Sequence, residues 1–278
     1  MTYEQGGSGG AGVLVLQNSG NLLSLEQRIE NHVSSSFEAL FTSARLSSDL
    51  VNQMSEFFEL NRTKPSGRFH AYHIPVSEDN ISRTQSLVSF LAKHNIRCEA
   101  VLENTRISQA WEYGIGDTRS IVAKKGDLLI NAHQTHSGIL NVLFDPDPFL
   151  SDSLTYDITT WSVPYAYGLR TFGIQSLPLS ESWDAEAVIS DIGPAYGWAI
   201  PRNGLLDTRF IAQAMNEGLR IRTNAEPIVF ENVSLPRGSA IILKGDQKSY
   251  DQKSLIDKLQ ELSQSCQVEL TPLPTGHS

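Results

Sequence analysis

The closest histidines in this sequence form two pairs. His133 and His136 form a His-x-x-His pair, a spacing that places two imidazoles on one face of a helix, where they can share a metal ion. No carboxylate or thiolate stands near them in sequence, so surface loop histidines are the alternative interpretation. His70 and His73 fall on a predicted strand and should point to opposite faces. Because His-x-x-Glu does not occur, we expect the purified chain to bind no stoichiometric zinc.

Nucleophile and nucleotide motifs are weak in this chain. Cys98 and Cys266 do not lie between glycines at the spacing of a nucleophile elbow, so we expect ordinary buried or half-buried thiols. The glycine-rich stretch 6–12 matches both Gly-x-Ser-x-Gly and Gly-x-Gly-x-x-Gly. Both motifs need a helix directly after them, whereas an apolar, strand-like run follows here. A glycine turn between strands is therefore the simpler interpretation.

One carboxylate, Glu4, stands directly before this glycine-rich stretch. At the end of a short strand, beside residues without side chains, its head group would be open to close approach, as a general base requires. A solvated carboxylate at the surface is the alternative.

Composition limits the class of protein. The chain has 278 residues, of which 40% are hydrophobic and 19% charged, which is typical of a folded chain rather than a disordered one. Its net charge is −9, and no basic run is longer than Lys124-Lys125, so we expect no nucleic-acid partner. No apolar run approaches the ~18 residues of a membrane-spanning helix.

Two helices are predicted near the beginning, at about 24–42 and 46–60. Ser24 and Gln27 fit a capping box, and apolar residues then recur on one face. We expect these helices to pack together and onto the strand Val13–Leu16. The breaker at 61–67 is the best domain boundary.

After residue 68 the pattern alternates between strand and helix. Strands are predicted at 69–74, 96–102, 120–123, 128–130, 195–200, 219–223, 238–243 and 268–273. Helices are predicted at 82–94, 207–216 and 254–265, with a short helix at 107–113 and a short helix or strand at 138–144. Such alternation predicts the α/β class, with a doubly wound, mostly parallel sheet covered by helices on both faces.

Residues 1–12, MTYEQGGSGGAG, resemble the strand of carboxypeptidase A-like zinc carboxypeptidases that carries the catalytic glutamate. The likeness is closest to a bacterial group in which a second α/β domain follows the peptidase domain. Further segments that resemble this group are 23–32, 125–134, 142–146 and, most strongly, 152–168. Residues 218–222 and 235–242 resemble the class I glutamine amidotransferase-like domain appended to these peptidases.

The resemblance implies two parts. Residues 1–62 would be the C-terminal remnant of the zinc carboxypeptidase catalytic domain, a strand with two closing helices. Residues 68–278 would be the amidotransferase-like α/β domain, with a subdivision near 174–190 left open. By the same resemblance, Glu4 is the general acid/base beside a zinc-bound water in the parent enzyme. The parent would hydrolyse a peptide or protein substrate, and its family suggests a periplasmic or secreted location.

The family's zinc ligands precede that glutamate, and only three residues precede Glu4 here. We therefore expect zinc in the parent enzyme but none in this chain, which alone should not hydrolyse peptides. The amidotransferase likeness concerns the fold only, because no nucleophile elbow is seen.

Two other hypotheses remain at this point. One is a non-catalytic module that binds a small ligand or a protein, with a crevice at the strand ends formed by 190–203 and the helix start 204–207. The other is a metal-dependent enzyme that uses His133 and His136.

Overall fold

The computed structural model describes residues 14–17, 19–77, 79–147, 162–183, 190–202, 204–230 and 233–275. The chain is mixed α/β, as predicted, and its contacts divide it into two compact units, residues 1–60 and 61–278. We describe each unit by itself. That they correspond to a peptidase remnant and an appended domain stays a prediction.

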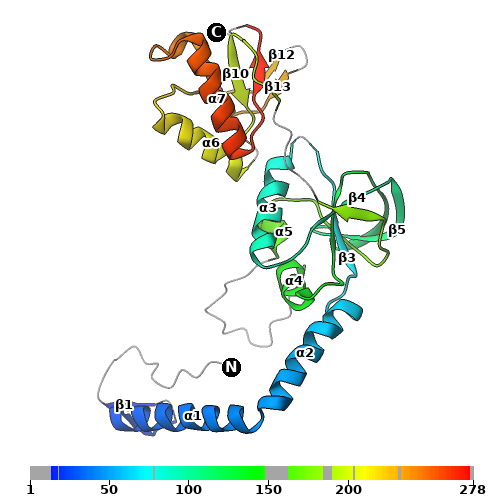
Figure 1. Ribbon diagram of the computed structural model, residues 1–278, viewed down its shortest axis with the longest axis vertical. Helices are drawn as coiled ribbons and strands as arrows, with labels where there is room; N and C mark the ends of the chain where they lie inside the picture. Colours follow the sequence, from blue (N-terminus) through cyan, green and yellow to red (C-terminus); the bar gives the residue numbers. More distant parts are fainter. Residues whose placement is uncertain are drawn as a thin grey trace. The chain divides into compact units, whose positions relative to one another are not determined.

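The first unit consists of a small hairpin and two helices (Figure 1). Strands β1 (Leu14–Leu16) and β2 (Leu22–Ser24) pair antiparallel, and α1 (Leu25–Arg45) and α2 (Ser47–Thr63) follow, with the end of α2 already in the second unit. The predicted capping box is confirmed, because the Gln27 amide donates to Ser24 Oγ and the Ser24 amide to Gln27 Oε1, each at 3.1 Å.

We expected the two helices to pack together, but α2 continues from α1 at an angle instead of folding back along it (Figure 1). Their apolar stripes consequently stay exposed. Side chains such as Ile29, Phe37 and Met54 are each more than half exposed.

Among the described residues, the second unit contains two main sheets and a separate two-stranded hairpin. The larger one has seven strands in the order β6-β5-β8-β3-β7-β4-β9. In chain order, the elements of this part are β3 (Ala71–Ile74), α3 (Ile81–Lys93), β4 (Glu99–Val101), β5 (Thr105–Glu112), β6 (Asp117–Ala123), β7 (Leu128–Asn131), α4 (Ser137–Phe144), α5 (Val163–Ala166), β8 (Phe172–Ile174) and β9 (Ser180–Ser182).

The central strands of this curled sheet, β8, β3 and β7, are buried on both faces. On one face, Tyr72 and Ile74 of β3 pack with Leu87 and Leu91 of α3 and with Phe144 of α4. On the other face, where the sheet curls toward itself (Figure 1), the described core is built from small and branched residues together with Phe172: Ala71, Val101, Ile107, Ala110, Ala123, Leu129 and Ile174. All four residues of β3 are therefore buried.

The short helix predicted at 107–113 is wrong, since these residues belong mostly to β5. Strands β5 and β6 form a hairpin whose turn includes Gly114 and Gly116, both at positive φ. The pairing register shifts between Ile107 and Ala110. Such a bulge adds a residue to one strand and so breaks the two-residue alternation that identifies a strand in a sequence.

The smaller sheet has the strand order β11-β14-β10-β15. Its elements are β10 (Gly197–Ile200), α6 (Leu205–Asn216), β11 (Arg222–Thr223), the hairpin of β12 (Ile228–Phe230) and β13 (Val233–Leu235), β14 (Ala240–Leu243), a 3₁₀ turn η1 (Lys244–Asp246), α7 (Gln252–Cys266) and β15 (Thr271–Leu273). With the β12–β13 hairpin left aside, this connectivity and order are those of the split β-α-β, ferredoxin-like arrangement. Helices α6 and α7 contact each other, and the core includes Trp198, Phe210 and Leu259.

The predicted doubly wound, mostly parallel sheet is wrong. In the described parts of the chain, every pair of neighbouring strands runs antiparallel. In the smaller sheet the two strands of each β-α-β unit are parallel but separated by an inserted antiparallel strand, so alternation in sequence does not produce parallel neighbours. The carboxyl ends of the strands consequently do not meet at one edge, which removes the geometric reason for a crevice at residues 190–207.

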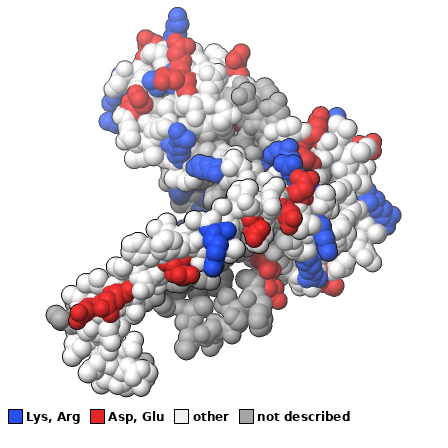
Figure 2. Space-filling model, turned by 60° about the horizontal axis from the view of Figure 1, so that its bottom comes forward, with Lys and Arg blue, Asp and Glu red and all other residues white. Residues whose placement is uncertain are grey.

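Within the described residues, no helix is both long and apolar enough to cross a membrane. Figure 2 shows Lys and Arg interspersed with Asp and Glu over the face that it draws.

Candidate functional site

Glu4, the predicted catalytic residue, lies outside the described residues, as does most of the segment 152–168. The site described below is therefore built from residues of the second unit.

His133 and His136 lie in the loop between β7 and α4, where His136 is the N-cap of α4. His133 Nδ1 is 3.2 Å from Asn131 Oδ1, and its ring packs edge-on against the ring of His70, with centroids 5.2 Å apart. Burial, and then the neighbouring His70, lower the pKa of His133. In the described part of the chain, no three His, Cys, Asp or Glu side chains converge to hold a metal ion, and the expectation that the chain binds no zinc stays a prediction.

A pocket of about 520 Å³ opens beside this loop. It is lined by Arg62, Asn95, Arg97, His133, Gln134, Thr135 and His136. No Asp or Glu is among these lining residues, although the chain as a whole carries a net charge of −9. We call this the cationic pocket. Two guanidinium groups and the N-terminal end of α4 all favour an anion there.

Hydrogen bonds hold the wall of the cationic pocket in shape. Gln134 is only 4% exposed, and its Oε1 accepts from the Arg97 amide at 2.8 Å while its Nε2 donates to the Asn131 carbonyl at 2.6 Å. On the other side, Asn61 Nδ2 donates to the Thr135 carbonyl and Arg62 Nε to Thr135 Oγ1, each at 3.0 Å. The loop is thus fixed to the segment before β4 and to the end of α2.

Arg97 differs from the other charged residues of this region. Its backbone is bound by Gln134, but its guanidinium makes no hydrogen bond or ion pair with any residue that the structure describes. The side chain therefore keeps its full hydrogen-bonding capacity for a ligand.

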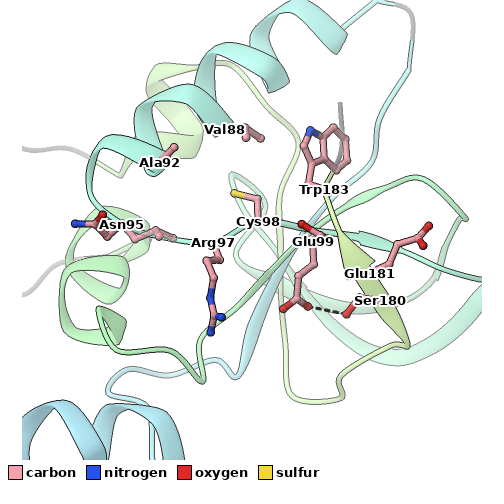
Figure 3. A pocket seen from close by; sticks show the side chains of 11 residues that line it. Val88, Ala92, Asn95, Arg97, Cys98, Glu99, Ser180, Glu181 and Trp183 are labelled. Carbon is pink, nitrogen blue, oxygen red and sulfur yellow. Dashed lines mark hydrogen bonds between the residues drawn. The ribbon is translucent and has the colours of Figure 1, made fainter. Parts of the chain in front are cut away.

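A second pocket, of about 760 Å³, shares Asn95 and Arg97 with the first. Its other lining residues are Val88, Ala92, Ile96, Cys98, Glu99, Ser180, Glu181, Ser182 and Trp183. We call it the apolar pocket, after Val88, Ala92, Ile96, Cys98 and Trp183. Figure 3 shows Val88, Cys98 and Trp183 at one end, while the Arg97 side chain extends away from Trp183. Glu99 is engaged within the protein, since Glu99 Oε2 accepts from Ser180 Oγ at 2.6 Å.

Neither cysteine is placed as a nucleophile. Burial, and then the neighbouring Glu99, raise the pKa of Cys98 to about 12, so it is a protonated thiol at neutral pH. Cys98 also directly precedes strand β4, whereas an elbow nucleophile stands between a strand and a helix. Cys266, at the end of α7, is buried and its Sγ donates to Gln213 Oε1 at 3.0 Å. The expectation of buried or half-buried thiols is confirmed.

The segment 190–203, proposed as part of a crevice, is bound to the C-terminal part of the chain. Ser190 Oγ donates to Glu269 Oε1 at 2.9 Å, and the Ile192 amide donates to Gln260 Oε1 at 2.7 Å. These bonds engage the polar groups at the beginning of the segment within the protein. A ligand crevice at 190–207 stays a prediction.

Two buried ionic groups were not found from the sequence. His73, 1% exposed, lies with its Nε2 2.8 Å from Asp127 Oδ2. Glu112, also buried, contacts Arg119 Nε at 2.6 Å and Arg170 Nε at 2.7 Å. For Asp127, the sequence signal is its position next to the turn glycine Gly126. For Glu112, it is the position at the end of strand β5.

The arginines of the candidate site were missed because they come from separate segments. Arg62 ends α2 and Arg97 precedes β4, and only the pairing of β4 with β7 brings Arg97 to the histidine loop. No local spacing signals this arrangement.

No family model matches the sequence, and no significant match was found among curated proteins or solved structures.

Proposed function

We propose that this chain is the C-terminal portion of a zinc carboxypeptidase-like protein that hydrolyses peptides, with Glu4 as the catalytic acid/base of the parent. The observation that carries the proposal is the exposed apolar stripe of α1 and α2. Within each helix, most of its residues are spaced three or four positions apart, and all are 45–67% exposed: Leu25, Ile29, Val33, Phe37, Leu40, Phe41, Leu50, Val51, Met54, Phe57 and Leu60.

A stripe of this kind buries itself on a partner surface, because a contiguous apolar face is costly in water. Residues 23–32 resemble the helices that close the peptidase fold. We therefore propose that the stripe packs on the upstream part of the catalytic domain. The zinc ligands belong to that same part, and the chain alone is not competent in hydrolysis.

The test is a longer protein that joins the upstream coding sequence to this chain. We expect it to bind zinc and to release C-terminal residues from peptides. Glu4→Gln should keep zinc and substrate binding but reduce kcat ~10²–10⁴-fold, the usual worth of general acid–base catalysis.

The matched control is Glu30→Gln, an exposed carboxylate on α1, which should leave kcat unchanged. Unchanged turnover in Glu4→Gln would remove Glu4 from the mechanism. A longer protein with neither zinc nor peptidase activity would remove the proposal and favour a free-standing binding module.

A further inference from the structure

The two adjoining pockets of the second unit differ in chemistry and meet at Arg97. The cationic pocket presents two guanidinium groups and the N-terminus of α4, and has no carboxylate among its described lining residues. Guanidinium binds carboxylate through two parallel hydrogen bonds, and Arg97 has that capacity available. This side of the site therefore suits a carboxylate.

The apolar pocket suits the apolar groups attached to such an anion. Val88, Ala92, Ile96 and Trp183 form a surface on which aliphatic or aromatic side chains can be buried. Glu99 and Glu181 also line it, so a ligand with several negative charges would be repelled. A single carboxylate next to apolar side chains fits both pockets better than a phosphate-rich ligand does.

The edge of the larger sheet can pair with the backbone of a peptide ligand. Among the described residues, strand β9 ends the strand order and pairs only with β4. All three of its residues, Ser180–Ser182, line the apolar pocket. An edge strand offers unpaired N–H and C=O groups to an extended peptide, the mode of recognition known as strand addition.

We propose that these two pockets bind the C-terminal segment of a peptide. The terminal carboxylate lies at Arg97 in the cationic pocket, the last side chains lie along the apolar pocket toward Trp183, and the peptide backbone runs beside β9. Glu4 is not among the described residues that line these pockets, and the proposed binding needs no zinc, so the proposal goes beyond the peptidase activity proposed above.

Calorimetric titration of the full chain with acetyl-Ala-Ala-Phe tests the proposal. We expect saturable binding in the micromolar to millimolar range, corresponding to roughly −4 to −8 kcal/mol. The same peptide with a C-terminal amide should bind at least ~10-fold more weakly, since the charge-assisted hydrogen bonds to Arg97 are lost. Arg97→Gln should reduce affinity for the free acid to that of the amide.

Arg237→Gln is the matched control, because Arg237 is exposed and lines neither pocket. Trp183→Ala should weaken binding of the peptide without changing the preference for the free acid over the amide. The melting temperature of each variant reports on folding. Arg97→Gln should keep that of the wild type because its guanidinium has no partner among the described residues.

Two further ligands identify the source of the carboxylate. If the peptide binds more tightly than N-acetylphenylalanine, the site recognises several residues at the end of a peptide chain. Equal affinity indicates that it recognises only one residue with a free carboxylate. Inorganic phosphate that binds more tightly than the peptide, equal binding of acid and amide, or the absence of binding by a folded chain would each overturn the proposal. None of these results bears on the zinc peptidase proposal, because no hydrolysis is measured.

Discussion

Asp127 connects three segments of the larger sheet through one buried carboxylate. Its Oδ2 lies 2.8 Å from His73 Nε2 and accepts from the Lys124 amide at 2.8 Å, and its Oδ1 accepts from the Val76 amide at 3.0 Å. Burial alone would raise the pKa of Asp127, but the hydrogen bonds from His73, Val76 and Lys124 outweigh it and hold the pKa below its usual value.

Asp127→Asn should lower the free energy of unfolding by about 1–3 kcal/mol at pH 7, because buried donors lose a charged acceptor. Since the folded pKa is depressed, this stabilisation is fully present above the unfolded pKa of ~3.9 and is lost as pH falls through the folded value. The difference between wild type and variant should therefore shrink in acid.

Urea unfolding at several pH values measures this effect. Asp257→Asn, at an exposed position of α7, is the control and should change little. If the free energies of unfolding of the wild type and Asp127→Asn differ by the same amount at pH 3 and pH 7, the carboxylate charge contributes nothing to stability.

Cys98 should be unreactive in the folded protein. With its pKa raised to about 12 by burial and then by Glu99, it holds almost no thiolate at pH 7.5. In a Cys266→Ser background, iodoacetamide should label Cys98 only after unfolding in guanidinium, as followed by mass spectrometry. Rapid labelling of the native protein would contradict this and would reopen nucleophilic chemistry at this position.

Among the elements, helices were predictable and strand pairing was not. Helix α1 begins after the predicted capping residue Ser24, and Gly218, at φ +81°, follows α6 as its predicted stop. These signals are local, so the sequence contains them. The bulge in β5 and the antiparallel order of both sheets depend on distant partners, which spacing along the chain does not report.

Dependence on partners that are distant in sequence also limits how much of the candidate site could be predicted. His133, His136 and Cys98 could be singled out by residue type, but Arg97 reaches the histidine loop only through the pairing of β4 with β7.

Gly173 in β8 is a position where a single methyl group should be costly. A Cβ there would lie 2.5 Å from the ring of Phe69, which packs against Tyr72 and Trp111 with centroids 6.0 and 5.7 Å away. Gly173→Ala should thus destabilise the protein by about 1–3 kcal/mol through overpacking.

Gly193→Ala is the matched control, since nothing lies within 4 Å of a Cβ built there. Urea midpoints of the two variants make the comparison. If both equal that of the wild type, Phe69 can move aside and the core at β8 is not tightly packed.

At the scale of the whole molecule, the apolar stripe of α1 and α2 should have opposite effects in two contexts. Phe37 is 56% exposed, so Phe37→Glu should raise the soluble fraction of the isolated chain. In the longer protein proposed above, the same change should lower the melting temperature, because that proposal buries the stripe, and with it the new charge, against the upstream part of the catalytic domain.

Ser36→Glu, at an exposed position beside Phe37, is the control and should have neither effect. An unchanged melting temperature of the longer protein carrying Phe37→Glu would show that the stripe is not covered there.

The smaller sheet also has a consequence for synthesis of the chain. Strand β10 leaves the ribosome before the other strands of this sheet, yet its two neighbours, β14 and β15, are the last two strands of the sheet in chain order. The nascent sheet therefore cannot close before β15 has emerged, in contrast to the β5–β6 hairpin, whose partners are neighbours in the chain. Trp198, in β10, is paired and buried only once these later strands are in place, so we expect this sheet to form after the β5–β6 hairpin and to expose Trp198 in the meantime.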